Sequence, residues 1–123
     1  MRLPLIPFVL AIAAWMACAS CAATLAPAAP VVTPAGVRFV VAYPEARTVA
    51  VAGTFNQWSP VSHPLVLSAA PGIWTTVVPL PPGEHLFMFV VNGDEWLTPP
   101  LAEDFADDGF GLKNGVVIVR PER

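Results

Sequence analysis

Residues 82–93 read PGEHLFMFVVNG and contain the signals that decide the fold. Aromatic and β-branched residues fill 84–91, a composition typical of a β-strand. Pro82-Gly83 marks a turn before this run, and Asn92-Gly93 tolerates the positive φ angles of a two-residue hairpin turn. We therefore expect 84–91 to fold back against a short strand around Glu95–Leu97.

Side chains along 84–91 alternate between the two faces of the expected strand. We predict that the face carrying both phenylalanines lies in the core. That face comprises His85, Phe87, Phe89 and Val91, and the opposite face comprises Leu86, Met88 and Val90.

Similar runs recur along the chain between turn signals, and no long helical period is present in the sequence. Short strands at this spacing are typical of a sandwich rather than of a helical or βαβ fold. We predict an all-β fold, with a β-sandwich over residues 37–121 and Trp74 in its core. The other expected strands are 37–43, 47–54, 73–80 and 116–119.

Length and charge limit the possible functions. The chain has 123 residues, of which 12% are charged, and its formal net charge is −3. This length suits one domain and leaves no room for a second, catalytic one. The net negative charge argues against a nucleic-acid partner. Arg2 is the only charged residue before Arg38, whereas all nine acidic residues lie between Glu45 and Glu122, so the N-terminal part has a different character.

The first 21 residues have the features of a targeting segment: Arg2, an apolar stretch from Leu3 to Ala19, and then small residues. Three interpretations fit: a cleaved secretory signal, a lipoprotein signal that leaves Cys21 as the lipid-bearing residue, and an uncleaved membrane anchor. Each of them predicts export to a bacterial-type cell envelope. Residues 22–36 are rich in Pro and Ala and are expected to form an extended tether.

Motifs for metal binding or catalysis are weak. Cys18 and Cys21 have C-x-x-C spacing, but they lie in the targeting segment with no second ligand pair downstream. The acidic stretch 103–108 lacks the spacing of a calcium loop and is predicted to be a solvated loop. No nucleophile motif flanks His63 or His85, and nothing places two carboxylates across a bond as a glycosidase requires. We expect no metal site, no cofactor and no enzymatic activity.

Two tryptophans are expected outside the core. Trp58 lies in the polar, proline-ended segment 53–60, GTFNQWSP, and Trp96 follows the hairpin tip at Asn92-Gly93. An exposed indole ring can stack on the apolar, slightly positive C–H face of a sugar. The alternative for Trp58 is a plug folded back over the end of the sandwich.

Four features occur in a recognisable order: VAVAGTFNQW at 49–58, PGEHLFMFVVNG at 82–93, Trp96, and NGVVIV at 114–119. Together they resemble the glycogen-binding domain of the AMP-activated protein kinase beta subunit, a member of carbohydrate-binding module family 48. The similarity covers about residues 37–119. The family also supplies the early-set domains of isoamylases and glycogen branching enzymes, so the resemblance implies an immunoglobulin-like (early-set) β-sandwich.

The resemblance also implies a site. The sugar-stacking tryptophans of the family match Trp58 and Trp96, the asparagine that binds glucose hydroxyls matches Asn114, and the apolar loop residue that enters the curved glucan matches Phe110. The chain departs from the family at Met88, where kinase-type domains carry a sugar-binding lysine. A thioether cannot donate a hydrogen bond, so this site lacks one polar contact.

We therefore expect a non-catalytic carbohydrate-binding module for α-glucan of the glycogen or starch type. The alternative is a sandwich that has kept the fold without the sugar and serves in protein interaction or envelope structure. An accessory module to a separate glucan-active enzyme is a variant of this alternative. Contact with a membrane through the N-terminal segment is compatible with either function.

Overall fold

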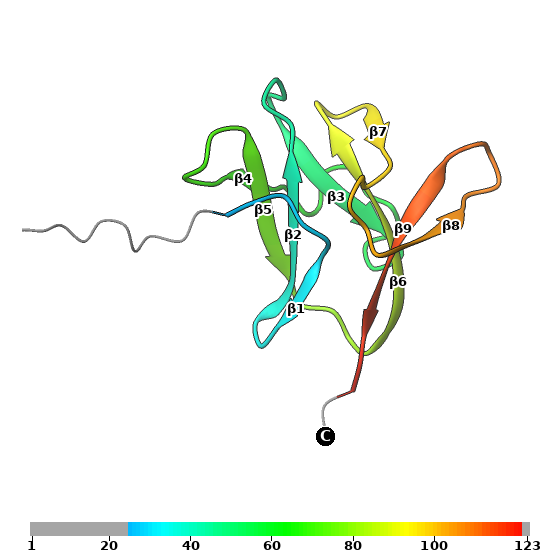
Figure 1. Ribbon diagram of the computed structural model, residues 1–123. Helices are drawn as coiled ribbons and strands as arrows, with labels where there is room; N and C mark the ends of the chain where they lie inside the picture. Colours follow the sequence, from blue (N-terminus) through cyan, green and yellow to red (C-terminus); the bar gives the residue numbers. More distant parts are fainter. Residues whose placement is uncertain (1–24, 122–123) are drawn as a thin grey trace, which may run out of the picture.

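The computed structural model describes residues 25–121, and in this range the chain forms nine β-strands and no helix. Two antiparallel sheets face each other as the layers of a sandwich (Figure 1). The predicted all-β, immunoglobulin-like sandwich is confirmed. The strands are β1 (Val31–Thr33), β2 (Gly36–Ala42), β3 (Val49–Gly53), β4 (Val66–Leu67), β5 (Ile73–Val78), β6 (Gly83–Val91), β7 (Glu95–Leu97), β8 (Asp104–Asp107) and β9 (Lys113–Val119).

Strand β6 is the centre of the second sheet. The first sheet has the order β1-β2-β5-β4, and the second has the order β3-β6-β9-β8 with β7 also paired to β6. Strand β3 pairs with β6 on one edge, from Phe87 to Val91. On the other edge β9 pairs with 83–87 and β7 with 89–91. Strands β7 and β9 therefore follow one another along the same edge of β6.

The core is built around Phe39 of β2, which is fully buried. Its ring centroid lies 4.9 Å from that of Phe87 and 6.5 Å from that of Phe89, both on β6. Trp74 is buried as predicted, and its indole N–H donates a 3.0 Å hydrogen bond to the carbonyl of Tyr43. The predicted core face of β6 is thus confirmed, because aromatic edge-to-face packing across the sandwich joins the two sheets.

The opposite face of β6 is also covered. Met88 and Val90 are buried although they point away from the phenylalanine cluster. A central strand acquires such cover when neighbouring loops and hairpins fold over its outer face. Met88, on this outer face, lies in the candidate site described below.

The β6–β7 turn differs from the two-residue loop that we expected. Three residues, Asn92 to Asp94, separate the paired Val91 and Glu95. Asn92 and Gly93 both have positive φ, at 55° and 85°, and the Asp94 N–H donates to the Val91 carbonyl. The Asn-Gly pair therefore forms the tight turn that its chemistry predicts. Asp94 is the additional residue.

The prediction of a solvated loop over 103–108 is wrong for its central part. Asp104–Asp107 forms strand β8, which pairs with β9 in a register that sets Phe105 opposite Gly115. Aspartate disfavours strands, but pairing with an already formed neighbour outweighs a weak local preference. The carboxylates of Asp104 and Asp107 remain exposed, in keeping with a solvated edge.

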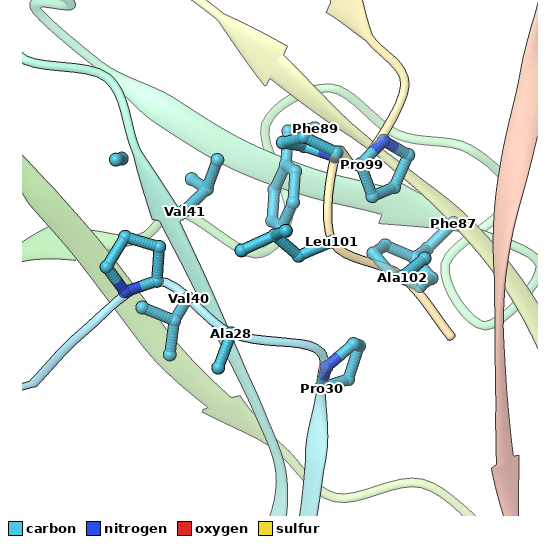
Figure 2. A pocket seen from close by; sticks show the side chains of 12 residues that line it. Ala28, Pro30, Val40, Val41, Phe87, Phe89, Pro99, Leu101 and Ala102 are labelled. Atoms are coloured by element: carbon cyan, nitrogen blue, oxygen red, sulfur yellow. The ribbon is translucent and has the colours of Figure 1, made fainter. Parts of the chain in front are cut away.

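The end of the expected tether belongs to the sandwich. Val31–Thr33 forms β1, which pairs with β2 in a register that sets Val32 opposite Val37. Just before it, the N-terminal segment 27–30 closes one side of an apolar pocket of about 260 Å³ between the sheets (Figure 2). The other walls come from β2, β6 and the connection 99–102 between β7 and β8.

The predictions for residues 1–21, including lipidation of Cys21, lie outside the residues that the structure describes. Within 25–121, no helix is long and apolar enough to cross a membrane.

If the N-terminal segment is part of the fold, its removal should weaken the sandwich. A chain that begins at Gly36 should be less stable than one that begins at Leu25, by on the order of 2–4 kcal/mol, because it loses the β1–β2 hydrogen bonds and uncovers the apolar pocket. Urea unfolding of the two truncated chains measures the difference. Equal stabilities would show that residues 25–35 do not stabilise the sandwich and serve only as a tether.

Candidate functional site

The five side chains that the sequence predicted for carbohydrate binding line one open groove of about 430 Å³ on the outer face of the second sheet. Two further side chains complete its lining. The lining consists of Trp58, Met88, Trp96, Asp108, Phe110, Leu112 and Asn114.

The floor of the groove is formed by Met88 of β6 and Asn114 of β9. Met88 is 4% exposed and Asn114 is 7% exposed. No intramolecular hydrogen bond holds the Asn114 amide in the described part of the chain, and no fully buried polar side-chain atom there lacks a partner. The amide therefore reaches solvent through the groove, where it can donate to and accept from a ligand.

Gly115 allows the chain to pass close beneath a neighbouring segment directly beside this floor. A Cβ atom at Gly115 would lie 2.8 Å from the Cγ of Pro99 and 2.9 Å from the Phe87 ring. Asn114 thus gives the groove a polar side chain. Gly115, which has no side chain, lets the backbone lie close to the Phe87 ring of the core.

Trp58 forms one wall and is held by a tightly bonded loop. Gln57 and Trp58 both have φ of 57°, a left-handed conformation that is uncommon for residues other than glycine. The Trp58 N–H donates a 2.9 Å hydrogen bond to the Gly53 carbonyl. Strained backbone of this kind persists where the surroundings determine it, and such positions gather at functional sites. The indole is half-buried, lining the groove rather than sealing the sandwich end.

The side chain of Asn56 provides those surroundings. Its Oδ1 accepts hydrogen bonds from the N–H groups of Gly53 (3.0 Å) and Ser59 (3.2 Å). Its Nδ2 donates to the Val51 carbonyl and lies 2.8 Å from Nδ1 of His63. Because an amide nitrogen only donates, His63 Nδ1 must be the acceptor. Asn56 therefore joins both ends of the loop that presents Trp58.

Trp96 forms a second wall from strand β7 and is 38% exposed. The preceding residue, Glu95, accepts a hydrogen bond from the Tyr43 hydroxyl at 3.2 Å, which ties β7 to the segment that follows β2 in the other sheet. This hydrogen bond to Glu95, more than any other effect, raises the pKa of Tyr43. Thr98 anchors the far end of β7 through a 2.8 Å hydrogen bond to the Lys113 carbonyl.

Phe110 projects from the tip of the β8–β9 hairpin and is 91% exposed. Asp108 organises this tip, because its Oδ1 accepts hydrogen bonds from the N–H groups of Phe110 (2.7 Å) and Leu112 (3.1 Å). At the base of the tip, Lys113 forms a 2.9 Å ion pair with Asp107. This hydrogen bond to Asp107 is the main reason that the pKa of Lys113 is raised.

Three contributors were missed by the sequence reasoning. Asp108 and Leu112 line the groove, and Asn56 positions Trp58. Asn56 stands within the FNQW motif and a buried polar role could have been suspected from it. No signal in the sequence distinguished Asp108 from its acidic neighbours, because only the hairpin register turns it toward the groove.

The groove is suited to binding by contact with flat, apolar surfaces. It combines two indoles and a phenyl ring with only two polar side chains, Asp108 and Asn114. His63 and His85 are engaged elsewhere, His85 through a 2.8 Å contact of its Nε2 with the Pro81 carbonyl. Among residues 25–121, no group of three or more His, Cys, Asp or Glu side chains is placed to hold a metal ion.

Asn56→Ala should destabilise the protein by about 2–4 kcal/mol, because it removes the side-chain partners of the buried Gly53 N–H and Val51 carbonyl. Urea unfolding measures the loss. The matched control is Gln57→Ala at the exposed neighbouring position, which should change stability little. A loss for Asn56→Ala no greater than for Gln57→Ala would show that the amide does not hold this loop together.

Comparison with known proteins shows which family the chain resembles. A family model described as the glycogen recognition site of AMP-activated protein kinase matches residues 37–123. A 1,4-alpha-glucan branching enzyme of Burkholderia vietnamiensis is 40% identical over 72 residues, which is 58% of this chain and 10% of the enzyme. That of Pseudomonas syringae pv. syringae is 38% identical over 72 residues, again 58% and 10%. That of Ralstonia nicotianae is 51% identical over 45 residues, 37% of this chain and 6% of the enzyme.

The chain spans about a tenth or less of the length of these relatives. The family model, in contrast, covers the sandwich from β2 to the end of the chain, including every residue that lines the groove. The chain therefore belongs to the glycogen recognition family of AMP-activated protein kinase, a family of carbohydrate-binding modules.

Proposed function

We propose that this protein is a non-catalytic module that holds α-glucan in the groove by stacking on Trp58 and Trp96. The observation that carries the proposal is that both tryptophans line one open groove, together with Asn114, in a member of a glycogen recognition family. The indole rings offer apolar faces to glucose C–H groups, and the Asn114 amide offers hydrogen bonds to hydroxyls.

The rigidity of the groove supports this function. Each wall is held by hydrogen bonds of its own: Asn56 for the Trp58 loop, Glu95 for β7, and Asp108 for the Phe110 tip. A site that is already ordered loses little conformational entropy when ligand binds, so modest contacts suffice for measurable affinity.

The alternative, a sugar-independent interaction module or an accessory to a separate glucan-active enzyme, is favoured by one observation. Met88 gives the floor of the groove no hydrogen-bond donor. The relatives named above are also much longer enzymes, in keeping with a module that serves a partner. Export through residues 1–21 and lipidation at Cys21 stay predictions of the sequence.

Trp58→Ala and Trp96→Ala should each weaken maltoheptaose binding about 10-fold or more, because each removes one stacking surface. Isothermal titration calorimetry measures the affinity. Phe105→Ala is the matched control, since Phe105 is an exposed aromatic residue on the neighbouring hairpin that does not line the groove.

Retained binding in both tryptophan variants would place the glucan elsewhere on the protein. Failure of the unaltered protein to bind at millimolar maltoheptaose would favour the interaction module instead. A loss for Phe105→Ala as large as for Trp58→Ala would point to a general effect on folding.

Met88→Lys should tighten maltoheptaose binding by about 3- to 10-fold, because a flexible side chain at the floor can bring a donor to the glucose hydroxyls, and one hydrogen bond contributes about 0.5–1.5 kcal/mol. Met88→Leu, which preserves the volume without adding a donor, should leave affinity unchanged. Calorimetry at equal ionic strength compares the two variants, with thermal unfolding to confirm that both are folded. Equal affinities would show that a polar contact at this position does not limit binding.

A further inference from the structure

We propose that Asp108 makes this groove selective for neutral α-glucan over glucan that carries phosphate or carboxylate groups. The inference rests on the proposed function of the groove and specifies its ligand. Among residues 25–121, Asp108 is the only ionisable side chain that lines the groove. The other lining residues have aromatic rings, aliphatic groups and one amide. None of them carries a positive charge that could balance the Asp108 carboxylate.

The Asp108 carboxylate is held in place rather than free to turn away. Its Oδ1 accepts two backbone hydrogen bonds, from Phe110 at 2.7 Å and from Leu112 at 3.1 Å. The Asp108 N–H in turn donates to the Leu112 carbonyl at 3.1 Å. Glycines at 109 and 111, both with positive φ, allow the chain to wrap around the side chain in this way. The charge therefore stays at the groove wall when a ligand arrives.

No cation neutralises this charge within residues 25–121. Lys113 is the nearest basic residue along the chain, and its ammonium group pairs with Asp107 at 2.9 Å instead. Met88, at the floor of the same groove, brings no charge. The groove thus has a negative wall and lacks the positive partner that would balance it.

The acids closest to Asp108 and Trp96 in the sequence are engaged elsewhere. Asp107 pairs with Lys113, and Glu95 accepts a hydrogen bond from the Tyr43 hydroxyl. Asp108 therefore carries the negative charge of the groove. Glucose hydroxyls can donate hydrogen bonds to the second carboxylate oxygen of Asp108, for which no hydrogen bond is found in the described chain. Phosphate and carboxylate groups have no such proton to donate at neutral pH and are repelled by the charge. Neutral glucan is therefore the ligand class that this wall accepts.

The test compares maltoheptaose with phosphorylated maltoheptaose in calorimetry at low ionic strength. A single uncompensated charge in a solvated site should give about a 3- to 10-fold preference for the neutral sugar. The preference should shrink as salt is raised toward about 0.15 M, because mobile ions screen exposed charges. Asp108→Asn keeps an oxygen acceptor for the hairpin tip and removes the charge, so it should bring the two affinities to within about 2-fold.

Asp104→Asn is the matched control, since Asp104 is an exposed acid on the same hairpin that does not line the groove. It should keep most of the preference. The inference is overturned if the unaltered protein binds both sugars equally, or if Asp108→Asn leaves the preference intact. Either result would leave the proposed function standing provided that Trp58→Ala weakens binding of the neutral sugar as predicted above. Absence of any binding of maltoheptaose would overturn both.

Discussion

The contact of Phe39 with the two phenylalanines of β6 is the constraint on which the rest of the molecule depends. It fixes one sheet against the other through rings whose centroids are 4.9 Å and 6.5 Å apart. Because side chains alternate along a strand, burying Phe87 and Phe89 inward obliges Met88 to face outward, onto the floor of the groove. Phe55 packs on Phe39 at 6.0 Å and stands at the start of the loop that carries Trp58. The core thereby sets both the floor and one wall of the site.

The other walls depend on polar side chains that lie outside the core. Asn92 accepts hydrogen bonds from the N–H groups of Arg47 and Thr48, which fixes the turn before β7. Asn56 and Asp108 have the same role in the Trp58 loop and in the β8–β9 tip. In each case a short polar side chain satisfies backbone groups that no strand partner can reach. The groove is consequently an arrangement of rigid loops on a rigid sheet, which suits recognition without conformational change.

The floor of the groove has no charged side chain at Met88, and this limits how the groove can bind a ligand. Met88 brings no hydrogen-bond donor to the floor, so the proposed binding of glucan would draw most of its affinity from stacking on aromatic rings, with polar contacts from Asn114 and Asp108. An acid without a balancing cation restricts the ligand further, because it attracts hydroxyl donors and repels anions. The uncharged floor at Met88 and the acidic wall at Asp108 thus favour the same proposed class of neutral ligand. The core and the floor of the groove are linked through the two faces of β6, whereas Asp108 comes from the tip between β8 and β9.

The family resemblance supplied the five candidate site residues. The sequence by itself determined the all-β class, the strands with strong β-branched and aromatic character and the core face of β6. Local propensity and alternation are enough for these, because they act over neighbouring residues. Strands β1 and β8 needed the tertiary structure, since Pro- and Asp-rich segments become strands only when a formed neighbour supplies hydrogen bonds. The bonding of Asn56 and the approach of Asp108 to the groove were also decided there. The position of Asp108 depends on segments that folding alone brings together, whereas Asn56 bonds to residues within seven positions of it in the sequence. No periodicity within a segment encodes either arrangement.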